Sequence, residues 1–245
     1  MALGKVLKDR PADPIKALGD ILSAKRVLLI ATSASKMGDH STGAWSEEIT
    51  GPYYVFTDAG CDVTLASISG GEIPIDAGSL SEQFKTANDA RFESTGDVAK
   101  LKTSVALSTL SASAFDIIFL AGGHGTCVDF VDGASSVVTE AYAAGRVVGA
   151  VCHGPMGLVN AKDGDQPLVA GKKVAAFSDA EEGMVGLTEK VPFLLEARLK
   201  ELGAEYVGAD AWAENAVLDG RLATGQNPMS SVKCAKLCLE AAGTA

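Results

Sequence analysis

The sequence lacks the basic residues that would suit an anionic partner. Its 245 residues contain 21 Lys and Arg against 31 Asp and Glu, which gives a net charge of −10. Nucleic acids and anionic membrane surfaces bind to basic patches, so this balance argues against both partners and suits a small neutral substrate. The chain also lacks an apolar run of membrane-spanning length, and its first 25 residues carry no apolar stretch typical of a secretory signal. These absences predict a soluble cytoplasmic protein.

Cysteine and histidine are scarce, and their positions exclude several kinds of site. The five cysteines are odd in number, irregularly spaced and without a C-x-x-C pair, so neither a disulfide framework nor a structural zinc site is expected. The three histidines are His40, His124 and His153. Because no histidine follows residue 153, the sequence excludes the triad order of the α/β-hydrolases and of the class I glutaminases, in which the histidine lies far downstream of the nucleophile.

What the sequence does contain is an alternation of short β-branched runs with helical patterns. This alternation predicts a doubly wound α/β fold, with a mostly parallel sheet and helices on both faces. Strands are expected at residues 26–31, 61–66, 115–121, 147–151, 173–177, 205–207, 211–213 and 221–224, and helices at residues 45–59, 135–144, 191–202 and 228–242. Residues 69–92 have no regular pattern, and so long a connection is expected to border a site. We expect one domain over residues 26–245, preceded by a leader at residues 1–25.

One predicted strand ends on a cysteine. The β-branched run at residues 147–151 is followed directly by Cys152, His153, Gly154 and Pro155. A cysteine on a sharp turn between a strand and a helix resembles the nucleophile elbow of the α/β-hydrolases, with sulfur in place of the serine oxygen. Because a helix N-terminus favours negative charge, it is expected to lower the pKa of this thiol. A buried structural cysteine is the alternative interpretation.

Two further segments are expected to converge on this cysteine. In an open parallel sheet, ligands bind at the carboxyl ends of the strands, near the switch in strand order. Gly122, Gly123 and His124 form a turn after one strand, and a loop of small residues at 32–43 leads from the first strand to Trp45. The glycine amides, with the amide of His153, are positioned to form an oxyanion hole. No G-K-[ST] follows the glycines, so a P-loop is not expected.

The residues alone leave the base of Cys152 open. Its neighbour His153, either of the other two histidines or a carboxylate can take this role. The carboxylate candidates are Glu47 and Glu48 in the first helix and Glu181 and Glu182 after the strand at residues 173–177. A solvated helix face is the alternative interpretation for each acidic pair.

Six segments together resemble one family. They are TGAWSEE followed by Pro52, DAGCDVTLAS, AGGHGT, AVCHGP, FSDAEE and DGRLATGQNP. From Arg26 to the C-terminus, the chain resembles the PfpI-type superfamily of class I glutamine-amidotransferase-like proteins, which includes the parkinsonism-associated deglycase and the heat-shock chaperone glyoxalases. The resemblance implies a flavodoxin-like sheet and a homodimer.

The resemblance also implies roles for individual residues. Cys152 matches the nucleophile, Glu48 the carboxyl that hydrogen-bonds its sulfur, and His153 the triad histidine. Glu182 matches the acidic residue that orients the histidine, with Glu181 and Asp179 as alternatives. The amides of Gly123 and His153 match the oxyanion hole. The residues expected to line the pocket are Trp45, Gly122, His124 and Asp39.

The implied activity is that of a glutathione-independent glyoxalase. Such an enzyme converts methylglyoxal and related 2-oxoaldehydes to 2-hydroxy acids, here lactate, through a hemithioacetal on Cys152, and it needs no cofactor. Some relatives bind zinc through two histidines and a carboxylate, but no such trio can be aligned in this sequence, so no metal is predicted. The alternatives are a protein deglycase, a holdase chaperone and a redox sensor in which Cys152 is oxidised to a sulfinic acid. A cysteine peptidase is a weaker alternative.

Overall fold

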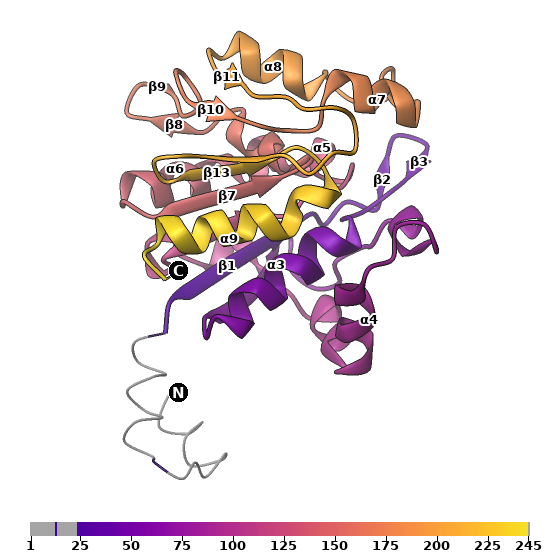
Figure 1. The fold of residues 1–245 in the computed structure, drawn as a ribbon, viewed down its shortest axis with the longest axis vertical. Coiled ribbons are helices and arrows are strands. Elements are labelled where there is room, and N and C mark those ends of the chain that lie inside the picture. Colours follow the sequence, from indigo (N-terminus) through magenta and orange to yellow (C-terminus); the bar gives the residue numbers. More distant parts are fainter. Residues whose placement is uncertain (1–12, 14–23, 245) are drawn as a thin grey trace.

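A sheet of seven strands carries the fold, and aliphatic residues dominate its central strands (Figure 1). The computed structural model describes residue 13 and residues 24–244, so the leader expected at residues 1–25 lies almost wholly outside the described residues. In spatial order the strands are β12 (Ala216–Asp219), β13 (Leu222–Gly225), β7 (Val147–Val151), β6 (Ile117–Leu120), β1 (Arg26–Ala31), β4 (Asp62–Ser67) and β5 (Val105–Ala106).

The strand order places a topological switch between β1 and β6. From β1 the chain continues to β4 and β5 on one side, and it then crosses to β6, β7 and β13 on the other. All neighbours pair in parallel except β12, which is antiparallel to β13. The predicted doubly wound, mostly parallel sheet is therefore confirmed, and its carboxyl edge at the switch is where a ligand is expected.

Helices cover both faces of the sheet, and the central strands are therefore buried on both sides. In β1, Val27 and Leu29 pack into one core cluster, whereas Leu28 and Ile30 pack into the other. The first cluster is covered by α3 (Ser46–Asp58), α4 (Ala87–Ser94) and α9 (Ser231–Ala241), and the second by α5 (Thr126–Gly133), α6 (Ser135–Ala143) and α8 (Leu195–Glu201). Figure 1 shows α3 and α9 side by side in front of the sheet.

Short elements complete the fold around the carboxyl edge and the periphery. Helix α7 (Asp179–Val185) follows β10 (Lys173–Val174), which pairs in parallel with the later strand β11 (Glu205–Tyr206). The remaining pairs are β2 (Lys36–Met37) with β3 (His40–Ser41) and β8 (Lys162–Asp163) with β9 (Gln166–Pro167). The 3-10 segments are η1 (Ala77–Leu80), η2 (Asp97–Lys102), η3 (Leu107–Thr109), η4 (Ala112–Ala114), η5 (Gly154–Leu158) and η6 (Pro228–Ser230).

Several predicted elements differ from the structure. The strand expected at residues 211–213 is a turn, because Trp212 adopts a φ of 64° that no strand accommodates. The strand β12, which follows it, was not predicted. The helix expected from residue 191 begins at Leu195; Val191 is excluded from it because the residue before a proline is disfavoured in a helical conformation. The strand expected at residues 173–177 pairs only at Lys173–Val174.

In the part of the chain that the structure describes, no helix is both long enough and apolar enough to cross a membrane.

Candidate active site

Cys152 lies at the carboxyl end of β7 in a strained turn. Its φ of 59° is in the left-handed region, which a residue with a side chain rarely adopts. Its amide donates to the carbonyl of Gly225 at 2.9 Å, and its carbonyl accepts from the amide of Phe177 at 3.0 Å. The backbone on both sides of the sulfur is therefore fixed, as in a nucleophile elbow.

The surroundings of the sulfur favour a neutral thiol, contrary to the thiolate predicted from a helix N-terminus. Cys152 is only 4% exposed. Burial and the nearby carboxyl of Glu48 raise its pKa well above the ordinary value, and the amide of His153 offsets this only in part. The segment that follows is the five-residue 3-10 helix η5, whose dipole is weaker than that of the expected α-helix. The thiol therefore needs a base.

His153 is positioned to be that base. Its Nδ1 lies 3.5 Å from the sulfur of Cys152, and its Nε2 lies 2.8 Å from Oε2 of Glu182. Burial and the nearby ring of His124 lower the pKa of His153 to about 4, so the imidazole is neutral at neutral pH. When Nε2 carries the proton and donates to Glu182, Nδ1 presents its lone pair to the thiol.

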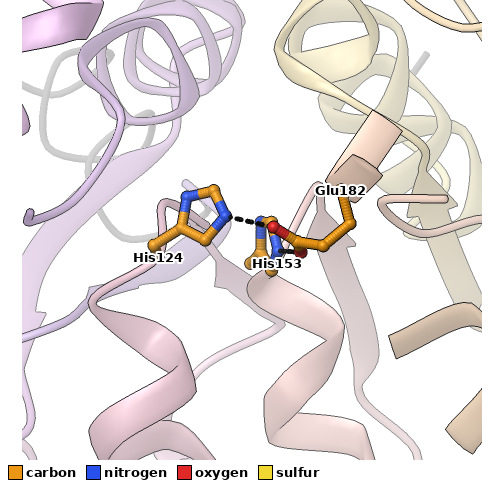
Figure 2. Close-up of side chains that lie close together, drawn as sticks. All are labelled: His124, His153 and Glu182. Atoms are coloured by element: carbon orange, nitrogen blue, oxygen red, sulfur yellow. Dashed lines mark hydrogen bonds and ion pairs between the residues drawn. The ribbon is translucent and has the colours of Figure 1, made fainter. Parts of the chain in front are cut away.

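Glu182 accepts from two histidines at once (Figure 2). It lies in the first turn of α7, and its Oε1 is 2.9 Å from Nε2 of His124. The two imidazole rings lie 4.1 Å apart between centroids. Burial opposes the charged form of Glu182, but the hydrogen bonds from both histidines outweigh it and lower the pKa to about 2. The carboxylate therefore stays ionised and can stabilise a protonated His153.

The two alternative orienting carboxylates have other partners. Glu181 is fully buried and accepts from the Ser178 hydroxyl and from the backbone amide of Trp212. Asp179 accepts from the amide of Ala197 at the start of α8. Of the three, the structure places Glu182 against the histidine.

Glu48 approaches the sulfur from another element. It lies in the first turn of α3, is fully buried, and accepts from the amide of Gly122 through Oε2 at 2.7 Å. Its Oε1 has no partner at hydrogen-bond geometry among the described residues, but the Cys152 thiol is near enough to act on its pKa. Burial dominates and raises the pKa of Glu48 to about 8. A buried carboxyl with one free oxygen beside a thiol is suited to proton transfer.

The turn at Gly122 and Gly123 admits no side chain. A Cβ at Gly122 would lie 2.5 Å from Oε2 of Glu48 and 2.6 Å from the carbonyl of Val151. Gly123 has a φ of 96°, and a Cβ there would collide with the backbone of Gly43 and Trp45. This close approach brings the turn, the elbow and the start of α3 together.

We expect Gly122→Ala to destabilise the fold and to displace Glu48. The contacts that a methyl group would meet include backbone, which cannot rotate away, so overpacking should cost about 1–3 kcal/mol. Urea unfolding of the variant and the parent measures this cost. Gly183→Ala is the control for a change of glycine alone: like Gly122 it has no positive φ, but a Cβ there meets nothing within 4 Å. Equal losses in both variants would contradict the close approach.

Thr126 is a neighbour of the candidate site that sequence reasoning missed. Its hydroxyl lies 2.8 Å from the carbonyl of Gly123 and 3.0 Å from the carbonyl of His153, so it bridges the glycine turn to the elbow. The threonine of the AGGHGT segment was the available signal, but a hydroxyl that binds two carbonyls across the fold leaves no local pattern in the sequence.

Of three further residues that were named from the sequence, one borders the candidate site and two do not. Trp45 precedes α3, and its amide approaches the carbonyl of Gly122 at 3.3 Å, so it borders the site. Asp39 is exposed and pairs with Lys190 instead of lining the pocket. Glu47 turns away from Cys152, and its carboxyl accepts from the side chain of Asn88.

The structure also assembles a trio of two histidines and a carboxylate that sequence reasoning did not find. The donor atoms of His124, His153 and Glu182 all lie within 4.8 Å of one another. Both Nε2 atoms are already hydrogen-bonded to the carboxylate, however, so none of these atoms needs an ion as a partner. A metal on Nε2 of His153 would also keep the proton on Nδ1, beside the thiol that needs a base. The trio therefore does not fit a resident metal.

The other four cysteines, Cys61, Cys127, Cys234 and Cys238, are unpaired and buried. Burial raises the pKa of the Cys127 thiol, which makes it a poor nucleophile.

Known proteins share this arrangement of elements and segments. The chain is 32% identical over 236 residues to the "Glutathione-independent glyoxalase HSP31" of Saccharomyces cerevisiae, covering 90% of this chain and 99% of that protein. It is 34% identical over 227 residues to "Glyoxalase 3" of Candida albicans, covering 86% and 95%. The crystal structure of glyoxalase III from Candida albicans superposes with a TM-score of 0.81 at 31% identity, covering 89% of this chain and 97% of that one. The model of the DJ-1/PfpI family matches residues 41–241. The chain belongs to the DJ-1/PfpI family.

Proposed function

We propose that this protein is a glutathione-independent glyoxalase that converts methylglyoxal and related 2-oxoaldehydes to 2-hydroxy acids. The observation that carries the proposal is the pair of proton-transfer groups at the buried thiol of Cys152: the neutral base His153 and the carboxyl of Glu48, whose pKa is about 8. The relatives that are named glyoxalases support the same activity.

The first step is addition of sulfur to the aldehyde carbon. The thiol proton passes to Nδ1 of His153, which Glu182 stabilises as an imidazolium, and the new C–S bond forms as the aldehyde π electrons move to oxygen. The amides of Gly123 and His153 are the proposed donors to that oxygen. The imidazolium returns the proton to the oxygen, which gives a neutral hemithioacetal.

The second step moves hydrogen between adjacent carbons. The carboxylate form of Glu48 removes the proton from the hemithioacetal carbon, which gives an enediolate with its negative charge on the former ketone oxygen. The resulting carboxyl returns this proton to the former ketone carbon, while the hydroxyl proton of the hemithioacetal passes to the former ketone oxygen. The aldehyde carbon is thereby oxidised to a thioester while the ketone is reduced to an alcohol, so no external oxidant is required. A pKa of about 8 keeps both forms of Glu48 available near neutral pH.

The last step is hydrolysis of the thioester. Neutral His153 can accept a proton from water as the water attacks the acyl carbon, and the imidazolium then protonates the departing sulfur. The products are the 2-hydroxy acid, lactate in the case of methylglyoxal, and the regenerated thiol. The homodimer and the cytoplasmic location expected from the sequence are part of this proposal.

The decisive assay follows methylglyoxal and lactate without glutathione. We expect protein dialysed against a chelator to consume methylglyoxal and to form one lactate for each aldehyde consumed. Denatured protein supplies the control for the uncatalysed reaction. A folded parent protein without turnover would contradict the proposal and would favour the redox sensor or the chaperone.

A further inference from the structure

The backbone of Trp212 is strained, and the proposed mechanism gives this residue no role. Among the described residues, Cys152 and Trp212 are the two non-glycine residues with positive φ, at 59° and 64°. Such a conformation persists only where the surroundings impose it, and it is found most often at functional sites. The strain at Cys152 is explained by the nucleophile elbow, whereas the strain at Trp212 requires another explanation.

The buried carboxyl of Glu181 holds this conformation. Its Oε1 accepts from the amide of Trp212 and from the side chain of Asn227, both at 2.9 Å. Its Oε2 accepts from the Ser178 hydroxyl at 2.7 Å and from the side chain of Gln226 at 3.1 Å. Asn227 and Gln226 also donate to the carbonyls of Ala213 and Ala209, on either side of Trp212. The loop at residues 209–213 is therefore held at both ends and at its centre.

This clamp places the indole ring in a row of aromatic side chains that starts at the catalytic histidine. The ring of Phe177 lies 4.5 Å from that of His153, and the Trp212 ring lies 5.8 Å from Phe177. Phe84 lies 6.4 Å beyond Trp212 and 5.1 Å from Trp45. Trp212, Phe84 and Trp45 are half-buried, so each keeps part of its surface exposed. The row runs from His153 at the elbow to Trp45 beside the start of α3.

We propose that Trp212, held by Glu181, forms the wall that receives the group attached to the ketone carbon, so that the protein prefers 2-oxoaldehydes with an aromatic group over methylglyoxal. This inference rests on the proposed glyoxalase function and deepens it. An aromatic substituent can stack on the edge or face of the indole, whereas a methyl group is too small to use that surface. Glu181 is a positioning residue, because it acts on the substrate only through Trp212.

The test compares phenylglyoxal with methylglyoxal as the ratio of their kcat/KM values. We expect the parent to prefer phenylglyoxal and Trp212→Gly to lower the ratio about tenfold, mainly through a higher KM for phenylglyoxal. Glycine adopts positive φ without strain, so this variant removes the ring without disturbing the loop. Trp212→Phe keeps an aromatic wall and should retain most of the preference.

A second variant tests the positioning role of Glu181. Glu181→Gln replaces one accepting oxygen by a donor, so the loop loses its clamp and the ratio should fall as it does in Trp212→Gly. Met184→Ala, an exposed change on the same helix, should leave the ratio unchanged. An equal loss of both activities in Glu181→Gln would indicate a merely structural role and would contradict the clamp.

The outcomes distinguish a failure of the glyoxalase function from a failure of the proposed role of Trp212. If the folded parent turns over neither aldehyde, the glyoxalase function is wrong. If the parent turns over both and the ratio is the same in Trp212→Gly, the function stands and the wall is overturned. Binding of the products gives a readout that does not depend on turnover: in Cys152→Ala, mandelate should quench the fluorescence of Trp212 at lower concentration than lactate. The variant Trp45→Phe leaves Trp212 as the sole tryptophan, which assigns the signal.

Discussion

Cys152→Ala is expected to abolish lactate formation from methylglyoxal, with a loss in kcat of at least about a thousandfold. Alanine cannot form the hemithioacetal, and without that covalent intermediate neither the proton transfer nor the hydrolysis has a substrate. The sulfur is also the only group in the proposed mechanism that both His153 and Glu48 approach. Steady-state kinetics with methylglyoxal, together with circular dichroism to verify the fold, measures this loss.

The control for Cys152→Ala is a second buried cysteine. Cys61 is free and buried in the core beside β4, so Cys61→Ala should retain activity within a few fold. A loss of less than about tenfold in Cys152→Ala would exclude the assigned nucleophile. Suppression of client aggregation that survives the same substitution would identify a chaperone activity independent of the thiol.

Glu48→Gln is expected to lose activity and to gain stability at the same time. Glutamine keeps the shape of the side chain but cannot carry the proton between the two carbons, so kcat should fall by about 10² to 10⁴. A substitution that lowered activity by unfolding the site would lower stability instead. The combination therefore distinguishes a proton-transfer group from a structural one.

The gain in stability follows from the raised pKa of Glu48. Between the ordinary value of 4.5 and the folded value of about 8, the folded protein keeps a proton that the unfolded chain releases. Stability therefore falls as the pH rises through this window, and the penalty is complete above pH 8. Removing the ionisable group should stabilise the fold by on the order of 4 kcal/mol at pH 8 and should have little effect at pH 4.

Thermal unfolding of both proteins from pH 4 to pH 8 measures this difference. Glu47→Gln is the matched control: burial also raises the pKa of Glu47, but its carboxyl bonds Asn88 and not the sulfur. We expect Glu47→Gln to retain turnover. A lower melting temperature of Glu48→Gln at pH 8 would contradict the assigned protonation of this carboxyl.

The sequence was sufficient for the sheet and for the turn that carries Cys152, because both depend on local patterns. The strand at Val147–Val151 and the turn into Cys152 are contiguous, so a β-branched run followed by Cys-His-Gly-Pro predicts them directly. The roles of Glu48 and Glu182 came from segments that resemble a family, and the structure places both beside the cysteine and histidine. Their catalytic roles stay predictions that the variants test.

The features that were missed depend on contacts between distant segments. The turn at Trp212 is imposed by Glu181, which lies 31 residues earlier on α7, whereas the local sequence AWA is compatible with a strand. Thr126 contacts the carbonyl of His153, which lies 27 residues later in the chain. The pKa of Cys152 was predicted in the wrong direction because burial, which a sequence does not display, outweighs the short helix that follows.

The adjacency of Glu181 and Glu182 on one helical turn constrains how the enzyme can evolve. Glu181 holds Trp212 and the next residue, Glu182, bonds His153, so a single-residue insertion or deletion before them would rotate both away by about 100°. The proposed acid–base chemistry and the proposed substrate preference would then be lost together. Directed evolution toward new aldehydes should therefore leave α7 unchanged and accumulate its substitutions in the loop at residues 209–213 and around Phe84.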